Sequence, residues 1–147
     1  MLALLQRVKS AKVVIGGEVA GAIDQGILLF LCAEPEDTSV TAGKLLTKVL
    51  RMRIFGDEQG KMNRSVQDVG GGLLVVSQFT LAADTRSGTR PGFSRAAAPA
   101  LGEALYDEFV AAARLAHPVV ATGRFGADMQ VELVNDGPVT IPMSVMA

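Results

Sequence analysis

Residues 73–81 read Leu73-Leu74-Val75-Val76-Ser77-Gln78-Phe79-Thr80-Leu81, and three glycines at positions 70–72 precede them. The apolar, β-branched start of this run predicts a central, buried strand. Alternation along a strand would send Ser77 and Phe79 to one face and Gln78 and Thr80 to the other. Polar groups at the end of a buried strand predict the floor of a site. Threonine is also a favoured strand residue, so a structural role for Thr80 stays open.

The segments on either side of this strand predict a long loop and two helices. Residues 82–95 are rich in turn-forming residues and show no periodicity, which is typical of loops that line sites. Pro99 then fits the first turn of a helix that keeps one apolar face and ends before Pro118. Upstream, Asp37 or Thr38 can cap a helix over residues 38–51, where apolar residues recur with the 3.6 period.

The rest of the chain reads as strands. Gly16-Gly17 lies between two β-branched runs and predicts a hairpin within residues 1–33, which end in the buried apolar strand 27–33. Further strands are predicted at residues 53–55, 119–121, 129–134 and 139–141, with residues 135–138 as the turn between the last two. No repeat or linker interrupts the pattern. The sequence therefore predicts a single α/β domain over residues 1–147, with mixed or antiparallel sheets packed with two main helices.

The composition bounds the class of protein. A chain of 147 residues is the size of one domain, and its 49% hydrophobic residues and mean hydropathy of +0.33 exceed what a small monomer needs. This excess is a weak indication of an oligomer. No apolar run approaches the roughly 18 residues of a membrane span, and the start of the chain lacks the features of a signal peptide. We therefore expect a cytoplasmic protein.

The inventory of reactive side chains is sparse. Cys32, the only cysteine, lies inside an apolar strand and is expected to be an inert core thiol. His117, the only histidine, precedes Pro118 at a helix exit, where a surface or capping role is expected. No residues show metal-ligand spacing, so neither a metal nor another cofactor is expected. Any hydrolysis must then act on an easily broken bond, such as an aminoacyl ester on a ribose, by orientation and aligned hydrogen-bond donors.

The net charge of −1 argues against a general nucleic-acid binder, but the charges are unevenly distributed. Two basic clusters occur: Lys44, Lys48, Arg51, Arg53, Lys61 and Arg64, and then Arg86, Arg90 and Arg95. Either could meet a phosphate backbone over a limited area, and solvated helix and loop faces explain them equally well.

A second segment, Asn135-Asp136-Gly137-Pro138-Val139-Thr140, joins two predicted strands. A cis Gly-Pro bond at such a turn would hold two neighbouring carbonyl groups in a fixed orientation. Local sequence alone favours the trans form, because only about 5–6% of X-Pro bonds in folded proteins are cis.

These two segments resemble the motifs of the D-aminoacyl-tRNA deacylase family, Ser-Gln-x-Thr and Asn-x-Gly-Pro-Val-Thr. The similarity runs nearly end to end, through Gln6-Arg7-Val8, Phe55 with Gly60-Lys61-Met62-Asn63, Arg90-Pro91-x-Phe93-Ser94 and Gly123 to Met129. Gly92 departs from the small polar residue expected at its position, which leaves the contacts of that loop in doubt.

The resemblance implies a barrel-like deacylase fold and a homodimer that acts on the aminoacylated 3′ end of tRNA, with its sites at the subunit interface. Gly137 and Pro138, cis in the family, would form a backbone filter that admits D-aminoacyl groups of many kinds, and also glycine, but rejects L-aminoacyl groups. Gln78 and Thr80 would be the catalytic residues, close to the ester carbonyl and the terminal adenosine. The residues implied to bind substrate or to support the filter are Ser77, Phe79, Asn135, Met129 and Arg7.

Two points stay open at this stage. Thr80 is a candidate nucleophile, but no evident base stands near it, so we favour hydrolysis assisted by the ribose 2′-hydroxyl, with Thr80 positioning the substrate. Two other functions also fit the residues: an ester hydrolase that uses Thr80 or Ser77 on a small substrate, and a dimeric tRNA- or nucleotide-binding module without catalysis. For Arg7 an exposed strand position, and for Met129 an ordinary core position, are equally compatible with the sequence.

Overall fold

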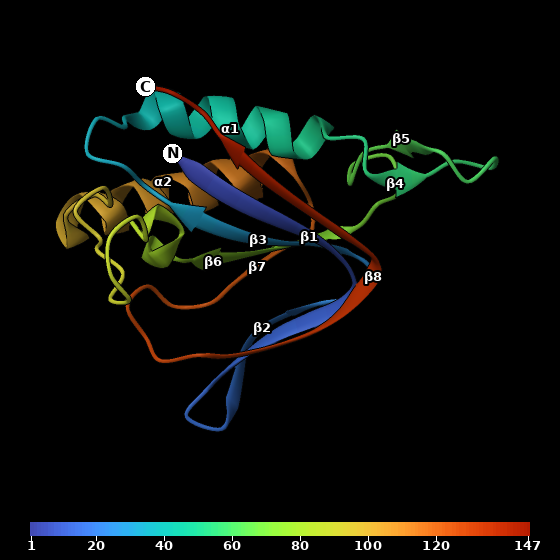
Figure 1. Ribbon diagram of the computed structural model, residues 1–147. Coiled ribbons are helices and arrows are strands. Elements are labelled where there is room, and N and C mark those ends of the chain that lie inside the picture. The colour runs from blue at the N-terminus through green and yellow to red at the C-terminus, as the bar shows by residue number, and fades with distance from the viewer.

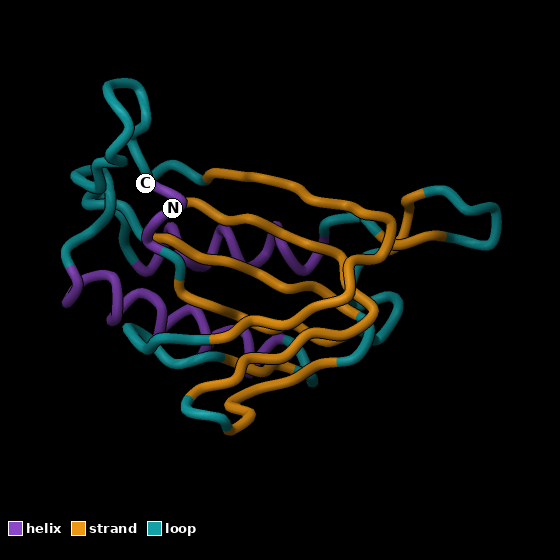
Figure 2. The backbone as a smooth tube through the Cα atoms, turned by 60° about the horizontal axis from the view of Figure 1, so that its bottom comes forward, coloured by secondary structure: helices purple, strands orange, loops and turns teal.

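The computed structural model describes all residues from 1 to 147 as a curved sheet with two helices on one of its faces (Figures 1 and 2). The strands of the main sheet are β1 (Leu2–Ile15), β2 (Glu18–Ile23), β3 (Gly26–Cys32), β6 (Gly72–Ser77), β7 (Val120–Thr122) and β8 (Gln130–Ser144). The other elements are helix α1 (Ser39–Arg51), the hairpin strands β4 (Phe55–Gly56) and β5 (Met62–Arg64), the 3-10 helix η1 (Phe79–Ala82) and helix α2 (Pro99–Ala116). Neither α1 nor α2 has the length and hydropathy of a membrane span.

The main sheet is mixed and nearly closes into a barrel, as the sequence and the resemblance predicted. The strand order is β2-β1-β3-β6-β7, and β8 pairs with β1 in addition to these neighbours. The strands β3, β6 and β7 run parallel to one another, and all pairs that involve β1 are antiparallel. At the open side β2 approaches β7 so closely that a Cβ on Gly21 would come within 2.3 Å of the carbonyl oxygen of Thr122. Only glycine permits this approach.

The larger hydrophobic core lies between the helices and the sheet, and a smaller one, which includes Val8, Leu28 and Val76, lies on the other face of the sheet. Helix α1 turns its apolar stripe inward, with Leu45, Leu46 and Val49 all buried, and α2 does the same with Leu105 and Phe109. Both helices match their predicted ranges to within one or two residues. Thr38 caps α1, and Asp37 is instead buried against the N-terminal ammonium group of Met1.

The strand predicted over residues 73–81 is too long. β6 ends at Ser77, because its neighbour β3 offers no partner beyond the last pair, Leu31 with Ser77. The chain then turns into η1, where Leu81 and Ala83 donate backbone hydrogen bonds to Gln78 and Thr80. The prediction that a strand places Ser77 and Phe79 on one face and Gln78 and Thr80 on the other is therefore wrong.

The turn predicted at residues 135–138 is also wrong, because β8 is one continuous strand. β1 is long enough to pair with both halves of it: Leu2 to Gln6 pair with Ser144 to Thr140, and Val8 to Val14 with Asn135 to Gln130. The register shifts between these halves, and β8 bends there (Figure 1). We call residues 135–138 the elbow.

His117 is a capping residue but not a surface residue. It is the C-cap of α2 and only 3% exposed, with its Nε2 2.7 Å from the carbonyl oxygen of Gly71. The end of α2 packs onto the start of β6 and encloses the ring there. Cys32 is buried, as predicted, and its expected inertness stays a prediction.

Candidate active site

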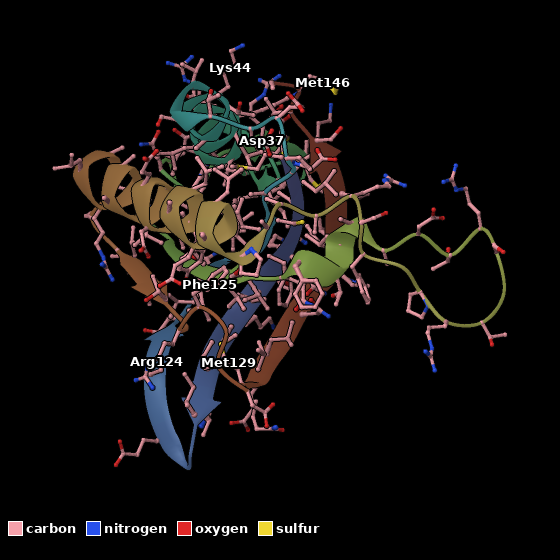
Figure 3. The ribbon with its side chains drawn as sticks, turned by 90° about the vertical axis from the view of Figure 1, so that its left-hand side faces the viewer. Asp37, Lys44, Arg124, Phe125, Met129 and Met146 are labelled. Atoms are coloured by element: carbon pink, nitrogen blue, oxygen red, sulfur yellow. The ribbon has the colours of Figure 1, made fainter.

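An apolar pocket of about 610 Å³ opens at the carboxyl ends of the parallel strands β3 and β6. Its walls come from the ends of these strands, from the start of α2 and from the segment before β8, and most of its lining residues are hydrophobic. Figure 3 looks onto this side of the molecule and shows Phe125 and Met129 on the segment between β7 and β8. Ligand sites in sheets with parallel strands favour this edge.

The rim of the pocket carries the polar side chains. Ser77 and Gln78 line the pocket, and the side-chain amide of Gln78 donates a hydrogen bond to the hydroxyl oxygen of Thr80. The turn of η1 makes this contact, because it folds residue 80 back toward residue 78. Thr80 itself does not line the pocket, but it is exposed and held beside the rim by this contact with Gln78.

Two aromatic rings stand beside this rim. Phe79 is 56% exposed, and its ring packs edge-to-face on that of Phe93, with 5.0 Å between the ring centroids and 74° between the planes. Phe93 belongs to the long loop after η1, which the bridge between Asp84 and Gly92 closes on itself. The pocket mouth therefore offers aromatic surface of the kind on which nucleobases stack.

Two ionisable side chains line the pocket, and both are neutral at neutral pH. Burial, with the charge of Asp107, raises the pKa of Tyr106 to about 12, and its hydroxyl donates to the carbonyl oxygen of Val75 at 2.8 Å. Burial also raises the pKa of the Cys32 thiol, which lies 3.6 Å from the carbonyl oxygen of Phe79. The side chains that line the pocket are thus uncharged, and the rim offers hydrogen-bonding groups.

No general base accompanies Thr80. His117 is held at Gly71, next to the start of β6, whereas Thr80 follows the opposite end of that strand. The one side-chain partner of the Thr80 hydroxyl is an amide that donates to it. No three His, Cys, Asp or Glu side chains come together in a group that could hold a metal ion.

The elbow forms a second constellation. The Gly137–Pro138 peptide bond is cis, and Gly137 has φ +130°, a conformation that residues with a Cβ rarely adopt. Arg7 on β1 holds the elbow: its Nε donates to the carbonyl oxygen of Asp136 at 2.9 Å, and its Nη1 donates to that of Ile54 at 2.7 Å. Asn135 is exposed and pairs with Val8 in the sheet.

The elbow lies far from the pocket of its own chain. The register puts Ser77 level with Ala3 on β1, and the elbow level with Arg7 and Val8. Five residues along a strand and three strand spacings separate Ser77 from the elbow, which is roughly 20 Å measured along the curved sheet. Within one chain the pocket is lined by Ser77, Gln78, Phe79 and Met129, and Thr80 is hydrogen-bonded to Gln78 beside it. A separate group on β1 and β8 contains Arg7, Asn135, Gly137 and Pro138.

Comparison with known proteins identifies a family that contains both the pocket residues and the elbow. The family model for D-Tyr-tRNA(Tyr) deacylase matches residues 4–144, which include both of them. The chain belongs to this deacylase family. D-aminoacyl-tRNA deacylases of Paracidovorax citrulli and Variovorax paradoxus are 66% and 64% identical over 145 residues, covering 99% of this chain and 94% and 99% of theirs.

Solved structures agree with the deacylase fold. The c-Myc DNA Unwinding Element Binding Protein superimposes with a TM-score of 0.95 at 39% identity, over 100% of both chains. A probable eukaryotic D-amino acid tRNA deacylase superimposes with a TM-score of 0.85 over 97% of both chains, and at 17% identity this likeness concerns the fold alone.

Several residues of this deacylase pocket were missed from the sequence. Tyr106 and Cys32 read only as core positions of a helix and a strand, and nothing local shows that their side chains reach a cavity. Phe93 and Phe125 belong to segments that resemble the family, so the aromatic residues of those segments were the available signal. Their contact with the pocket depends on packing between elements distant in sequence.

Proposed function

We propose that this protein hydrolyses the ester bond of D-aminoacyl-tRNA, releasing the free D-amino acid and tRNA, in the cytoplasm where charged tRNA is used. The observation that carries the proposal is the apolar pocket with Gln78 at its rim and Thr80 hydrogen-bonded to Gln78, in a member of this family. Such a site suits an ester that is already activated by its own ammonium group and needs little more than orientation. Glycine, which has no side chain, would also pass.

The defining assay compares deacylation of the same tRNA charged with the D- and the L-form of one amino acid. Rapid release of the D-amino acid and slow release of its mirror image are expected. Comparable rates on both would refute the chiral assignment. Rapid turnover of simple esters without tRNA would instead support a small-substrate esterase, and tRNA binding without release would support a binding module.

The chemistry proceeds with help from the substrate. Water attacks the ester carbonyl, the bond to the ribose 3′ oxygen breaks, and the neighbouring 2′-hydroxyl relays the proton to that oxygen. Thr80 orients the substrate, and Gln78 or main-chain amides around Phe79 stabilise the negative charge that develops on the carbonyl oxygen. Two observations support this assignment. The Thr80 hydroxyl accepts a hydrogen bond from the amide of Gln78, and His117 lies at the opposite end of β6, so no base is placed to deprotonate Thr80.

Thr80→Ala tests this mechanism. A variant that keeps a substantial fraction of kcat supports a positioning role for Thr80, because water is then the nucleophile and the ribose 2′-hydroxyl transfers the proton. Loss of nearly all turnover would favour Thr80 as the nucleophile. A substrate with a 2′-deoxy terminal ribose gives the complementary measurement, since the proposed relay is lost while Thr80 is intact.

The chiral filter works between two copies of the chain. The elbow lies roughly 20 Å along the sheet from Ser77 of its own chain, so we assign it to the pocket of a partner in a two-fold homodimer. There the carbonyl groups of Gly137 and Pro138 would receive the amino group of a D-aminoacyl ester. Val134 on β8, next to the elbow, is apolar and 53% exposed, which supports an interface on this strand.

Mixed dimers can test this sharing of the site. One chain carries Gln78→Ala, which damages the pocket, and the other carries Gly137→Ala, which damages the elbow. Random mixing would give half heterodimers with one intact site each, so about a quarter of the wild-type activity should return. No recovery on mixing, in a protein that sediments as a monomer, would overturn the shared site.

A further inference from the structure

A second hollow, remote from the pocket, is lined by positive charge. Its volume is about 570 Å³, and Lys44, Thr47, Lys48, Arg51, Met52, Arg53 and Met62 line it. We call it the basic cleft. It lies between the outer side of α1 and the β4–β5 hairpin, which adjoins the end of α1 in Figure 1.

The charges of the basic cleft are not neutralised within the chain. Lys44, Lys48, Arg51 and Arg53 are all exposed, and none of them takes part in a salt bridge. Helix α1 contains no acidic residue at all. The exposed acidic residues of the neighbouring helix do not line the hollow. Four positive charges therefore face solvent together.

The spacing of these cations is specific to one face of the helix. Lys44, Lys48 and Arg51 follow one another at intervals of four and three residues, opposite the buried stripe of α1. Figure 3 shows Lys44 on the outer side of the helix, away from the sheet. Like charges at this spacing destabilise an isolated helix. The favourable effect of a cation on the helix dipole reaches only the last turn, so it does not account for Lys44 or for Arg53 beyond the helix.

We propose that the basic cleft binds the phosphate backbone of the tRNA substrate, beyond the short 3′ end that enters the pocket. This inference rests on the proposed function. The start of α1 adjoins the pocket through Ala33 and Met1, which line it, and Asp37, which binds the ammonium group of Met1. At 1.5 Å per residue the cations begin about 8 Å along the helix and extend to about 18 Å. A bound nucleic acid that leaves the pocket along α1 therefore reaches them.

The partner is a polyanion because of the chemistry of the hollow. Lysine and arginine on one face, without acceptors among them, suit contacts with phosphate groups, and such contacts carry no sequence information. The cleft would thus add affinity without regard to tRNA sequence. It would leave the choice between D- and L-aminoacyl groups to the pocket and the elbow.

The double variant Lys48→Ala/Arg51→Ala tests the inference on two substrates, D-aminoacyl-tRNA and the corresponding D-aminoacyl-adenosine. On tRNA, kcat/KM should fall on the order of tenfold near physiological salt, mainly through KM. The slope of log(kcat/KM) against log[salt] should become shallower by roughly 1.4 to 1.8, one phosphate contact being lost per charge. On aminoacyl-adenosine, which has no backbone to bind, the rate should not change.

Two controls keep the outcome interpretable. Arg114→Ala removes an exposed cation from α2, outside the cleft, and should leave both substrates unaffected. Lys48→Arg/Arg51→Lys keeps both charges and should retain the wild-type salt slope. An unchanged kcat/KM on tRNA, or an equal loss on both substrates, would overturn the inference. If wild-type protein releases no D-amino acid from either substrate, the proposed function fails first.

Discussion

Replacing Gly137 with alanine is expected to weaken both the fold and the discrimination between D- and L-aminoacyl-tRNA. Gly137 has φ +130°, and an added Cβ would lie 3.0 Å from Nη2 of Arg7 and 3.1 Å from the backbone nitrogen of Val139. Backbone strain of this kind costs on the order of 1–3 kcal/mol. The protein should remain folded, since domains are stable by about 5–15 kcal/mol, but its Tm should fall by roughly 3–10 °C.

The loss of activity should be separable from the loss of stability. Relief of the strain would move the carbonyl groups of the elbow or the guanidinium group of Arg7, and a displacement near 1 Å at a reacting site can cost about 100-fold in rate. We expect kcat/KM on D-aminoacyl-tRNA to fall toward that extent, and the ratio of D to L rates to shrink. Deacylation of matched D and L substrates, with a thermal melt of the same sample, measures both effects.

Gly88→Ala provides the matched control. Gly88 also has a positive φ, of +68°, but nothing lies within 4 Å of an added Cβ. This variant should lose on the order of 1 kcal/mol of stability and keep the wild-type ratio of D to L rates. If Gly137→Ala behaves in the same way as Gly88→Ala, the elbow backbone does not act as the filter.

Three further predictions concern single, separable residues. Tyr106 is the only tyrosine in a chain without tryptophan, so the absorbance of tyrosinate should report its pKa of about 12 directly. Because that pKa lies above the ordinary value of 10, burial of the neutral Tyr106 provides at most about 2–3 kcal/mol of stability. This stability should be complete below pH 10 and lost between pH 10 and 12. Titration of Tyr106 near pH 10 in the folded protein would contradict the buried hydrogen bond to Val75. Cys32, buried and with a raised pKa, should react with a thiol reagent such as DTNB far more slowly in the native protein than in urea, and equal rates would mean that the pocket exposes the sulfur. Gly43→Ala, at an exposed position of α1 with open space around it, should raise the free energy of unfolding by about 0.5–1 kcal/mol, and a lower urea midpoint would show that the glycine has a role of its own.

Local sequence determined most of the elements. The apolar periodicity of residues 38–51 and the proline at position 99 gave the two helices, because these signals act within a few residues of the chain. The two glycines at positions 16 and 17 gave the first hairpin, since both adopt a positive φ in the turn. The motif residues from Ser77 to Thr80 and from Asn135 to Pro138 could likewise be singled out without a structure.

Tertiary structure decided where each strand ends and what each motif faces. β6 stops at Ser77 and η1 forms because β3 offers no further partner, and β8 runs through the elbow because β1 is long enough to pair with both of its halves. His117 is buried because α2 ends against Gly71. The separation of the elbow from the pocket is likewise a matter of register between distant segments. Backbone pairing and burial depend on which partner is present, and a sequence read one segment at a time does not contain that information.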